Sequence, residues 1–82
     1  MIASEMIRAL KKNFPDLDPQ TTSEFYGRKQ DVEGVWLRKA YMYNLTDYVL
    51  ENDYDNVLTE FIRSKGWFVE PYDCETFMAY KG

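Results

Sequence analysis

The chain has 82 residues, of which 45% are hydrophobic and 17% aromatic, and its formal net charge is −4. This length suits a single domain, residues 1–82, and the apolar content is enough for a packed core, which excludes a disordered chain. The acidic balance argues against direct nucleic-acid binding, because phosphate binding depends on clustered Lys and Arg.

Cysteine and histidine usage narrows the chemistry further. Cys74 is the only cysteine, and the sequence contains no histidine. An internal disulfide and a multi-cysteine zinc site are therefore excluded, and Cys74 has no histidine to act as its base. No stretch has the length and apolarity of a membrane span or a secretory signal. We expect a cytoplasmic, non-enzymatic protein without a catalytic site, cofactor or metal.

The first predicted helix carries Met6, Leu10 and Phe14 at helical spacing. Ser4 is suited to cap its start, and Pro15 ends it. The stretch FPDLDP that follows, with two prolines and two aspartates, is typical of a loop.

A hairpin is predicted next, with strands in QTTSEFYG (20–27) and EGVWLRKAYMY (33–43). Both stretches are rich in Thr, aromatic and β-branched residues, and glycines bracket the polar segment between them. In the second strand Val35 and Leu37 share one face, while Trp36 and Arg38 share the other. Neither face is cleanly polar, so the pattern leaves the inward side open.

A second helix is predicted from the stripe of Val57, Leu58, Phe61 and Ile62. If it ran from Thr46 onward as one helix, Asp47 would fall within the apolar arc, and burying an unpaired carboxylate costs several kcal/mol. We therefore expect the helix to begin near residues 52 or 53, with Asn52 as its cap.

Two final strands are predicted in WFVEPY and TFMAYK. Pro71 has no N–H to donate, so its strand should lie at a sheet edge or carry a bulge. The element order is α-β-β-α-β-β. It predicts an α+β fold, in which a four-stranded antiparallel sheet has two helices on one face.

The segment from Thr46 to Phe61 carries five acids and no base. Tyrosines interleave with the acids, and this combination suits a surface that receives Lys and Arg side chains by charge and by cation–π contact. The alternative explanation is a solvated helix start, where carboxylates stabilise the positive end of the helix dipole. The candidate partner-binding residues are Asp47, Tyr48, Glu51, Asp53, Tyr54 and Asp55.

The C-terminal stretch KGWFVEPYDCETFMAY contains the motif GW-x-x-E-x-Y-D-x-x-T, formed by Gly66, Trp67, Glu70, Tyr72, Asp73 and Thr76. It resembles a pattern in small uncharacterised proteins of bacteriophages and mobile elements. The chain departs from that pattern at Glu75, where the pattern has Gly, and at Pro71, where it has an aromatic residue. The resemblance implies a phage setting, in which small acidic proteins such as anti-CRISPR proteins block host nucleases, and it supplies no catalytic residue.

Three functional hypotheses follow. The first is a non-enzymatic inhibitor that blocks a basic nucleic-acid site or subunit interface of a host protein, such as a CRISPR effector or nuclease. The second is a structural domain that self-associates as a homo-oligomer through its tyrosine-rich sheet. The third is a binder of single-stranded nucleic acid, which would use the pairs Arg28-Lys29 and Arg38-Lys39 beside Tyr26, Trp36 and Tyr41.

Overall fold

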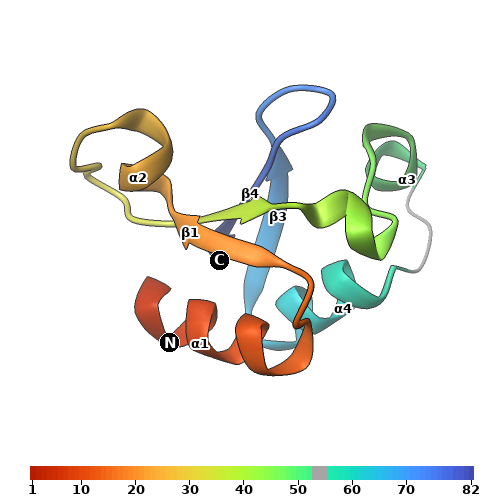
Figure 1. Cartoon of the computed structure of the whole chain (residues 1–82), viewed down its shortest axis with the longest axis horizontal. Helices are drawn as coiled ribbons and strands as arrows, with labels where there is room; N and C mark the ends of the chain where they lie inside the picture. Colours follow the sequence, from red (N-terminus) through yellow and green to blue (C-terminus); the bar gives the residue numbers. More distant parts are fainter. Residues whose placement is uncertain (53–55) are drawn as a thin grey trace.

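A computed structural model describes residues 1–52 and 56–82, and its centre is a four-stranded antiparallel sheet (Figure 1). The strand order across the sheet is β1-β2-β4-β3. The predicted α+β fold class is confirmed. The strands are β1 (Asp18–Thr21), β2 (Val35–Arg38), β3 (Trp67–Pro71) and β4 (Phe77–Lys81).

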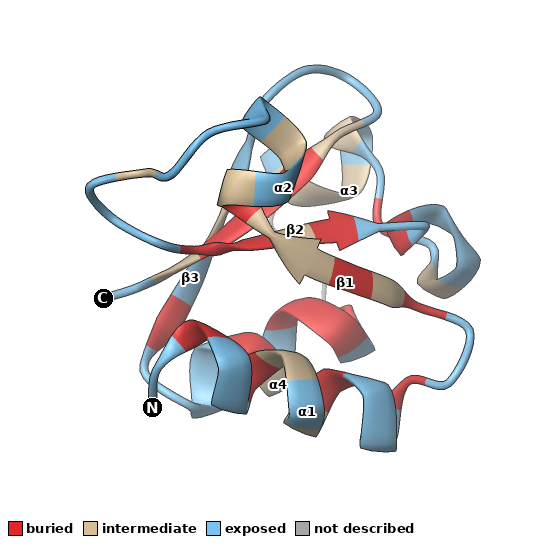
Figure 2. Cartoon of the chain, turned by 60° about the vertical axis from the view of Figure 1, so that its left-hand side comes forward, coloured by how far each residue is buried: buried red, intermediate tan, exposed pale blue. Residues whose placement is uncertain are grey.

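Two helices, α1 (Ala3–Asn13) and α4 (Val57–Ser64), cover one face of the sheet (Figure 1). Their buried sides turn toward the strands, and their outer sides are exposed (Figure 2). Within the described ranges, no helix is long and apolar enough to cross a membrane. The centre of the core consists of fully or almost fully buried side chains: Met6, Leu10, Val35, Leu37, Leu58, Ile62, Phe77 and Ala79.

The first helix forms as predicted, but its start differs. Ile2 is at the N-cap position, and its N–H donates to the Glu5 carboxylate over 2.8 Å. Ser4 lies inside the helix rather than at its cap. The reason is that the Glu5 side chain reaches back to a free N–H at the helix start, where the dipole also favours a carboxylate.

The predicted first strand is partly wrong, because the segment Thr22–Tyr26 forms a short helix, α2. The Thr21 hydroxyl accepts a hydrogen bond from the N–H of Glu24, and Gly27, with φ 73°, ends the helix. Threonine oxygens therefore act here as cap and turn partners rather than as β-forming side chains. The strand lies earlier, at Asp18–Thr21.

The predicted second strand ends earlier than expected. Lys39 adopts a left-handed conformation with φ 67°, and a 3-10 helix, η1 (Ala40–Tyr43), follows it. A positive φ cannot continue a strand, so β2 stops at Arg38. Within β2, Val35 and Leu37 are buried against the helices, which settles the inward side that the sequence left open.

The predicted start of the second long helix near Asn52 is wrong. Asn56 is the N-cap of α4, and its side-chain oxygen accepts from the N–H groups of Leu58 and Thr59. A separate helix, α3 (Asp47–Glu51), comes earlier and begins at Thr46, whose hydroxyl accepts from the Val49 N–H. The expectation that Thr46–Lys65 is not a single helix is confirmed. Asp53 and Asp55, predicted to lie in a first helical turn, are outside the described residues.

The last two strands form as predicted, and Pro71 lies in β3 at an edge of the sheet, as expected. One glycine is required by a close approach. A Cβ atom at Gly34 would lie only 2.5 Å from the Tyr80 ring and 2.6 Å from the Ala79 carbonyl oxygen. Tyr80 therefore packs directly over the backbone just before β2.

Candidate binding surface

The predicted acidic surface is centred on α3. Asp47 lies in the first turn of this helix, and Glu51 lies one turn later, so the two carboxylates share a face. Tyr48 projects beside them and is 63% exposed. None of the five residues of α3, all of which the structure describes, is buried. Tyr48 and Glu51 are exposed, and Asp47, Val49 and Leu50 are half-buried.

The two carboxylates of α3 stand outside the ion pairing that the structure shows in residues 1–52 and 56–82. Neither Asp47 nor Glu51 takes part in an ion pair there, and Arg38 pairs with Asp18 instead, over 3.3 Å. Like charges one helical turn apart repel each other by about 0.2–0.5 kcal/mol. This arrangement favours a surface that gains stability when an external cation approaches.

Of the six predicted partner-binding residues, the structure brings three together. Asp47, Tyr48 and Glu51 all belong to α3. The other three, Asp53, Tyr54 and Asp55, lie outside the described residues. Asp47, Tyr48 and Glu51 together form the α3 surface.

The sequence did not predict an aromatic cluster on the face of the sheet opposite α1 and α4. The Phe25 ring of α2 contacts Tyr26, Trp36 and Tyr72, with centroids 5.1, 5.0 and 4.8 Å apart, in edge-to-face geometry. Such pairs add to the stability gained from burial alone. The cluster holds α2 against the sheet and leaves Tyr26 and Tyr72 partly exposed. The alternation of side chains along β2 was a signal that could have placed Trp36 on this face. The contact with Phe25 could not be predicted, because the segment that forms α2 was expected to be a strand.

Two titratable groups on this side of the molecule have shifted pKa values. Burial, followed by the neighbouring Tyr26 phenol and the Glu70 carboxylate, raises the pKa of Tyr80. Burial also acts to raise the pKa of Glu33, but hydrogen bonds from Ser23 and Thr22 outweigh it, so the net shift is downward. Glu33 is thus a structural acceptor that ties the start of α2 to the segment before β2.

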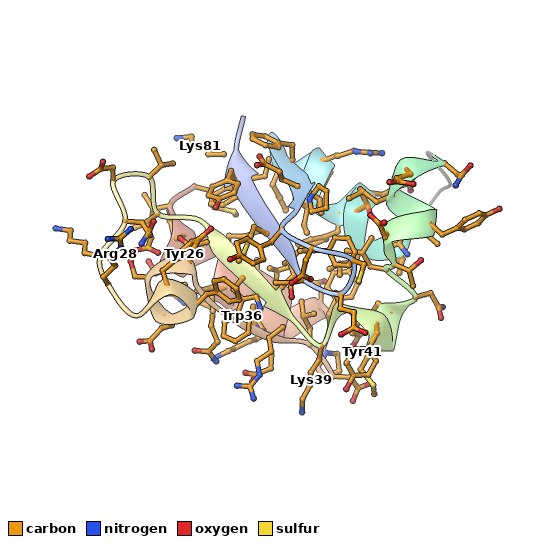
Figure 3. The ribbon with its side chains drawn as sticks, turned by 90° about the horizontal axis from the view of Figure 1, so that it is seen from above. Tyr26, Arg28, Trp36, Lys39, Tyr41 and Lys81 are labelled. Atoms are coloured by element: carbon orange, nitrogen blue, oxygen red, sulfur yellow. The ribbon has the colours of Figure 1, made fainter. Side chains whose placement is uncertain are left out.

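The basic residues of the third hypothesis do not form one patch. The face of the sheet opposite α1 and α4 is the open face. Arg28 and Lys39 lie at opposite ends of it, with Tyr26 and Trp36 between them (Figure 3). The Arg38 guanidinium stacks 5.6 Å from the Trp36 ring and is paired with Asp18. The cations available to a nucleic-acid backbone on this face are therefore separated, and the charge of Arg38 is already balanced by Asp18.

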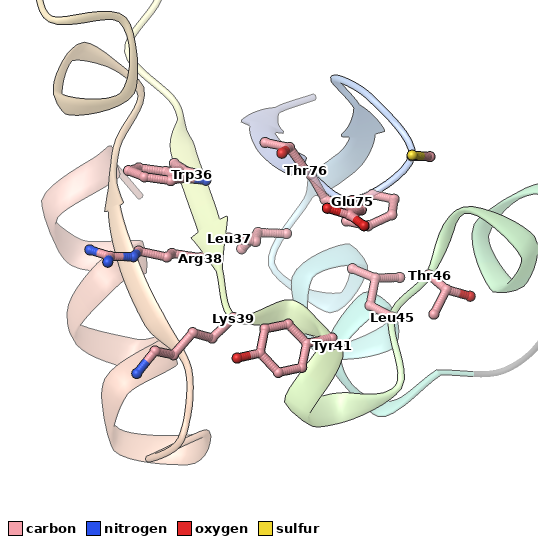
Figure 4. Close-up of a pocket in the computed structure, with 11 residues that line it drawn as sticks. Trp36, Leu37, Arg38, Lys39, Tyr41, Leu45, Thr46, Glu75 and Thr76 are labelled. Carbon is pink, nitrogen blue, oxygen red and sulfur yellow. The ribbon is translucent and has the colours of Figure 1, made fainter.

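A groove of about 450 Å³ lies between the end of β2 with η1 and the turn that joins β3 to β4 (Figure 4). Buried Leu37, Leu45 and Phe77 line it together with the exposed Tyr41. Lys39 and Glu75 contribute opposite charges to its rim, and the exposed Cys74 is part of the turn. Its volume falls within the range of small-ligand sites.

Comparisons of this chain with models of protein families, with curated proteins and with solved structures gave no significant match.

Proposed function

We propose that the protein is a non-enzymatic binding domain of the inhibitor type, whose α3 surface docks on a basic surface of a host protein. One observation carries the proposal: Asp47 and Glu51 share a face of α3, next to the exposed Tyr48, and have no cationic partner among the residues described. Binding of Lys and Arg side chains would remove the repulsion between the two carboxylates.

Charge and tyrosine contribute differently to such a contact. Carboxylates steer a basic partner toward the surface and raise the association rate, an effect that salt screens. An exposed tyrosine adds apolar area and a ring face for a cation at low entropic cost. The stretch from Ala40 to Ile62 contains no Lys or Arg, so nothing within it opposes that attraction.

The proposed setting is a bacterial host cell infected by a phage, and the proposed target is a CRISPR effector or another nuclease. The support for this setting is the resemblance of the C-terminal stretch GWFVEPYDCET to phage and mobile-element proteins. A protein channel built for nucleic acid is basic, so an acidic domain that occupies it competes with the nucleic acid.

The test is a double charge reversal, Asp47→Lys with Glu51→Lys. The labelled protein is used to capture binding proteins from host lysate, and bound proteins are eluted with increasing salt. We expect the variant to bind the salt-eluted partner at least about tenfold more weakly, because two attractive contacts become repulsive. The matched control reverses the exposed Asp16 and Asp31, which gives the same net charge away from α3.

Equal loss of binding in both double variants would show that net charge alone drives capture and would reject the α3 surface. Unchanged binding in the α3 variant would reject it as well. Circular dichroism of each variant establishes that the fold is intact before affinities are compared.

Self-association is the second candidate function, and the exposed aromatic residues of the open sheet face favour it. Phe68 on β3 and Tyr72 after it are both substantially exposed, and Tyr26 lies beside Tyr72 with ring centroids 6.0 Å apart. Exposed rings of this kind are common at protein interfaces. Light scattering over a concentration series tests it: a dimer that the change Tyr72→Ser dissociates supports this candidate, and a monomer throughout rejects it.

A further inference from the structure

The groove marks the place where two central strands separate. β2 and β4 pair at Val35↔Ala79 and Trp36↔Met78, and the pair that would follow, Leu37 with Phe77, is not part of the ladder. Both strands continue past this point with their other neighbours, since Arg38 pairs with Asp18 and Phe77 pairs with Pro71. The sheet is therefore split between two strands that are each held in place from the outside.

The alternation of an antiparallel ladder shows which main-chain groups face the split. The Thr22 N–H donates to the Gly34 carbonyl, so the main-chain N–H and C=O groups of Gly34 and of every second residue after it point toward β1. Those of Leu37, an odd number of residues further along, therefore point toward β4. The Tyr72 N–H donates to the Thr76 carbonyl, so the main-chain groups of Thr76 point toward β3. Those of the next residue, Phe77, therefore point toward β2. The Leu37 carbonyl and the Phe77 N–H thus lie just past the last ladder pair and face the groove.

The outer edges of the sheet are poor places for another strand to add. By the same alternation, Pro19 is one of the outward-facing positions of β1, and Pro71 is one of those of β3. Proline has no N–H to donate, and natural sheets use it to block edge pairing. At the internal split no proline removes a donor, so the Leu37 carbonyl and the Phe77 N–H are the groups that another strand could pair with.

The walls of the groove suit a peptide. Leu45 and Phe77, each only 1% exposed, form an apolar floor, and Tyr41, 65% exposed, forms an aromatic wall. At the mouth, Lys39 and Glu75 offer one charge of each sign, while Arg38 is already paired with Asp18. A phosphodiester backbone would meet the Glu75 carboxylate, whereas a peptide segment with an acidic and a basic residue complements both sides.

We propose that this groove binds an extended peptide segment of another protein by strand addition, with one large apolar side chain between Tyr41 and Leu45 and opposite charges at Lys39 and Glu75. The main chain of the peptide would pair with the groups facing the split, and the groove would select its side chains. This site is separate from the α3 surface and does not depend on it.

The probe is a panel of acetylated pentapeptides of the pattern Glu-Val-X-Val-Lys, in which X is Phe, Leu or Tyr, so that three central apolar residues lie between an acidic and a basic residue. Binding to the isotope-labelled full chain is followed by the amide signals in NMR spectra. We expect chemical-shift changes at Leu37 and Phe77, with a downfield shift of the Phe77 N–H as it gains a hydrogen bond. Peptides with N-methylated backbone amides keep the side chains but should bind about tenfold more weakly.

Matched variants separate this site from the α3 surface. Tyr41→Ala should weaken peptide binding by about tenfold, because it removes an aromatic wall, whereas Tyr48→Ala, at a residue of nearly equal exposure, should leave it unchanged. Lys39→Gly should raise Tm by about 4 °C, because glycine tolerates the positive φ, while it weakens binding of the peptides, whose Glu loses its cationic partner.

The proposal is overturned if no peptide of the panel shifts the groove amides, or if N-methylated and unmodified peptides bind equally. It is also overturned if oligo(dT) shifts these signals and the peptides do not, since the groove would then be a nucleic-acid site. Loss of peptide binding in the Asp47 and Glu51 variant, with Tyr41→Ala unaffected, would place the peptide on α3 instead.

Discussion

Helices α3 and α4 follow one another in the same acidic stretch, but they are held by different forces. α4 buries Leu58 and Ile62 completely, and its N-cap Asn56 is itself buried. α3 has no buried residue among its five described positions, and it touches the core only through the partly buried Leu50. Burial therefore fixes α4, whereas the Thr46 cap and the Leu50 contact are among the interactions that hold α3.

The difference explains why a binding surface can occupy one helix and not the other. A core helix offers half of its circumference to solvent, and changes on its inner half destabilise the fold. A helix of about one and a half turns is only marginally stable by itself and depends on its contacts. Because α3 has no buried residue, changes at its exposed positions Tyr48 and Glu51 leave the core undisturbed. Glu51 of α3 is exposed, and Asp47 lies in the first turn, where the helix dipole favours a carboxylate, whereas Asn56 of α4 is buried and caps its helix.

The largest expected effect comes from a core truncation in α4. Ile62→Ala should lower the free energy of unfolding by about 2–5 kcal/mol, because it leaves a cavity beneath the sheet. Leu50→Ala in α3 should cost clearly less, since Leu50 is already partly exposed. Urea denaturation of both variants measures the two values, and equal losses would show that α3 is as much a part of the core as α4.

The next effect concerns the caps. Asn56→Ala should cost about 1–2 kcal/mol, because the side chain accepts from two N–H groups of α4 and donates to the Tyr43 carbonyl over 3.0 Å. Thermal unfolding is the measurement. A change of Tm no larger than that of an exposed substitution such as Asp31→Ala would contradict this role for Asn56.

The corresponding cap of α3 should matter locally. Thr46→Ala removes the acceptor of the Val49 N–H and should cost about 0.5–1 kcal/mol of local helix stability. Hydrogen exchange should become faster at Val49 and Leu50 and stay unchanged at Ile62 in α4. Faster exchange in both helices would show that they unfold as one unit.

The smallest effect has the opposite sign. Glu51→Lys places a cation one turn after Asp47, so repulsion becomes attraction and the free energy of unfolding should rise by about 0.3 kcal/mol. The same change should weaken binding to a basic partner. Denaturation combined with the capture experiment checks both, and a variant that is less stable would mean that Glu51 has a structural partner.

Sequence patterns predicted the elements that bury a regular stripe. The helical spacing of Met6 and Leu10, and that of Leu58 and Ile62, located α1 and α4, and Pro71 correctly indicated an edge strand. The patterns failed where side-chain hydrogen bonds decide the backbone. At Thr21 a residue typical of strands caps a helix, because its hydroxyl finds the Glu24 N–H.

The candidate sites show the same division. The composition of the acidic stretch pointed to Asp47, Tyr48 and Glu51 before any fold was known, because charge is a property of the sequence itself. The groove between Lys39 and Glu75 left no such signal, because its two sides are far apart in the chain and meet only through the sheet.

The sequence by itself determined the fold class, the two core helices and the acidic character of the central stretch, since apolar periodicity and charge are local properties. Only the tertiary structure decided where β2 and β4 part, which aromatic residues meet on the open face, and that α3 stands apart from α4. These features depend on long-range packing and on individual cap hydrogen bonds, which the order of residues does not display.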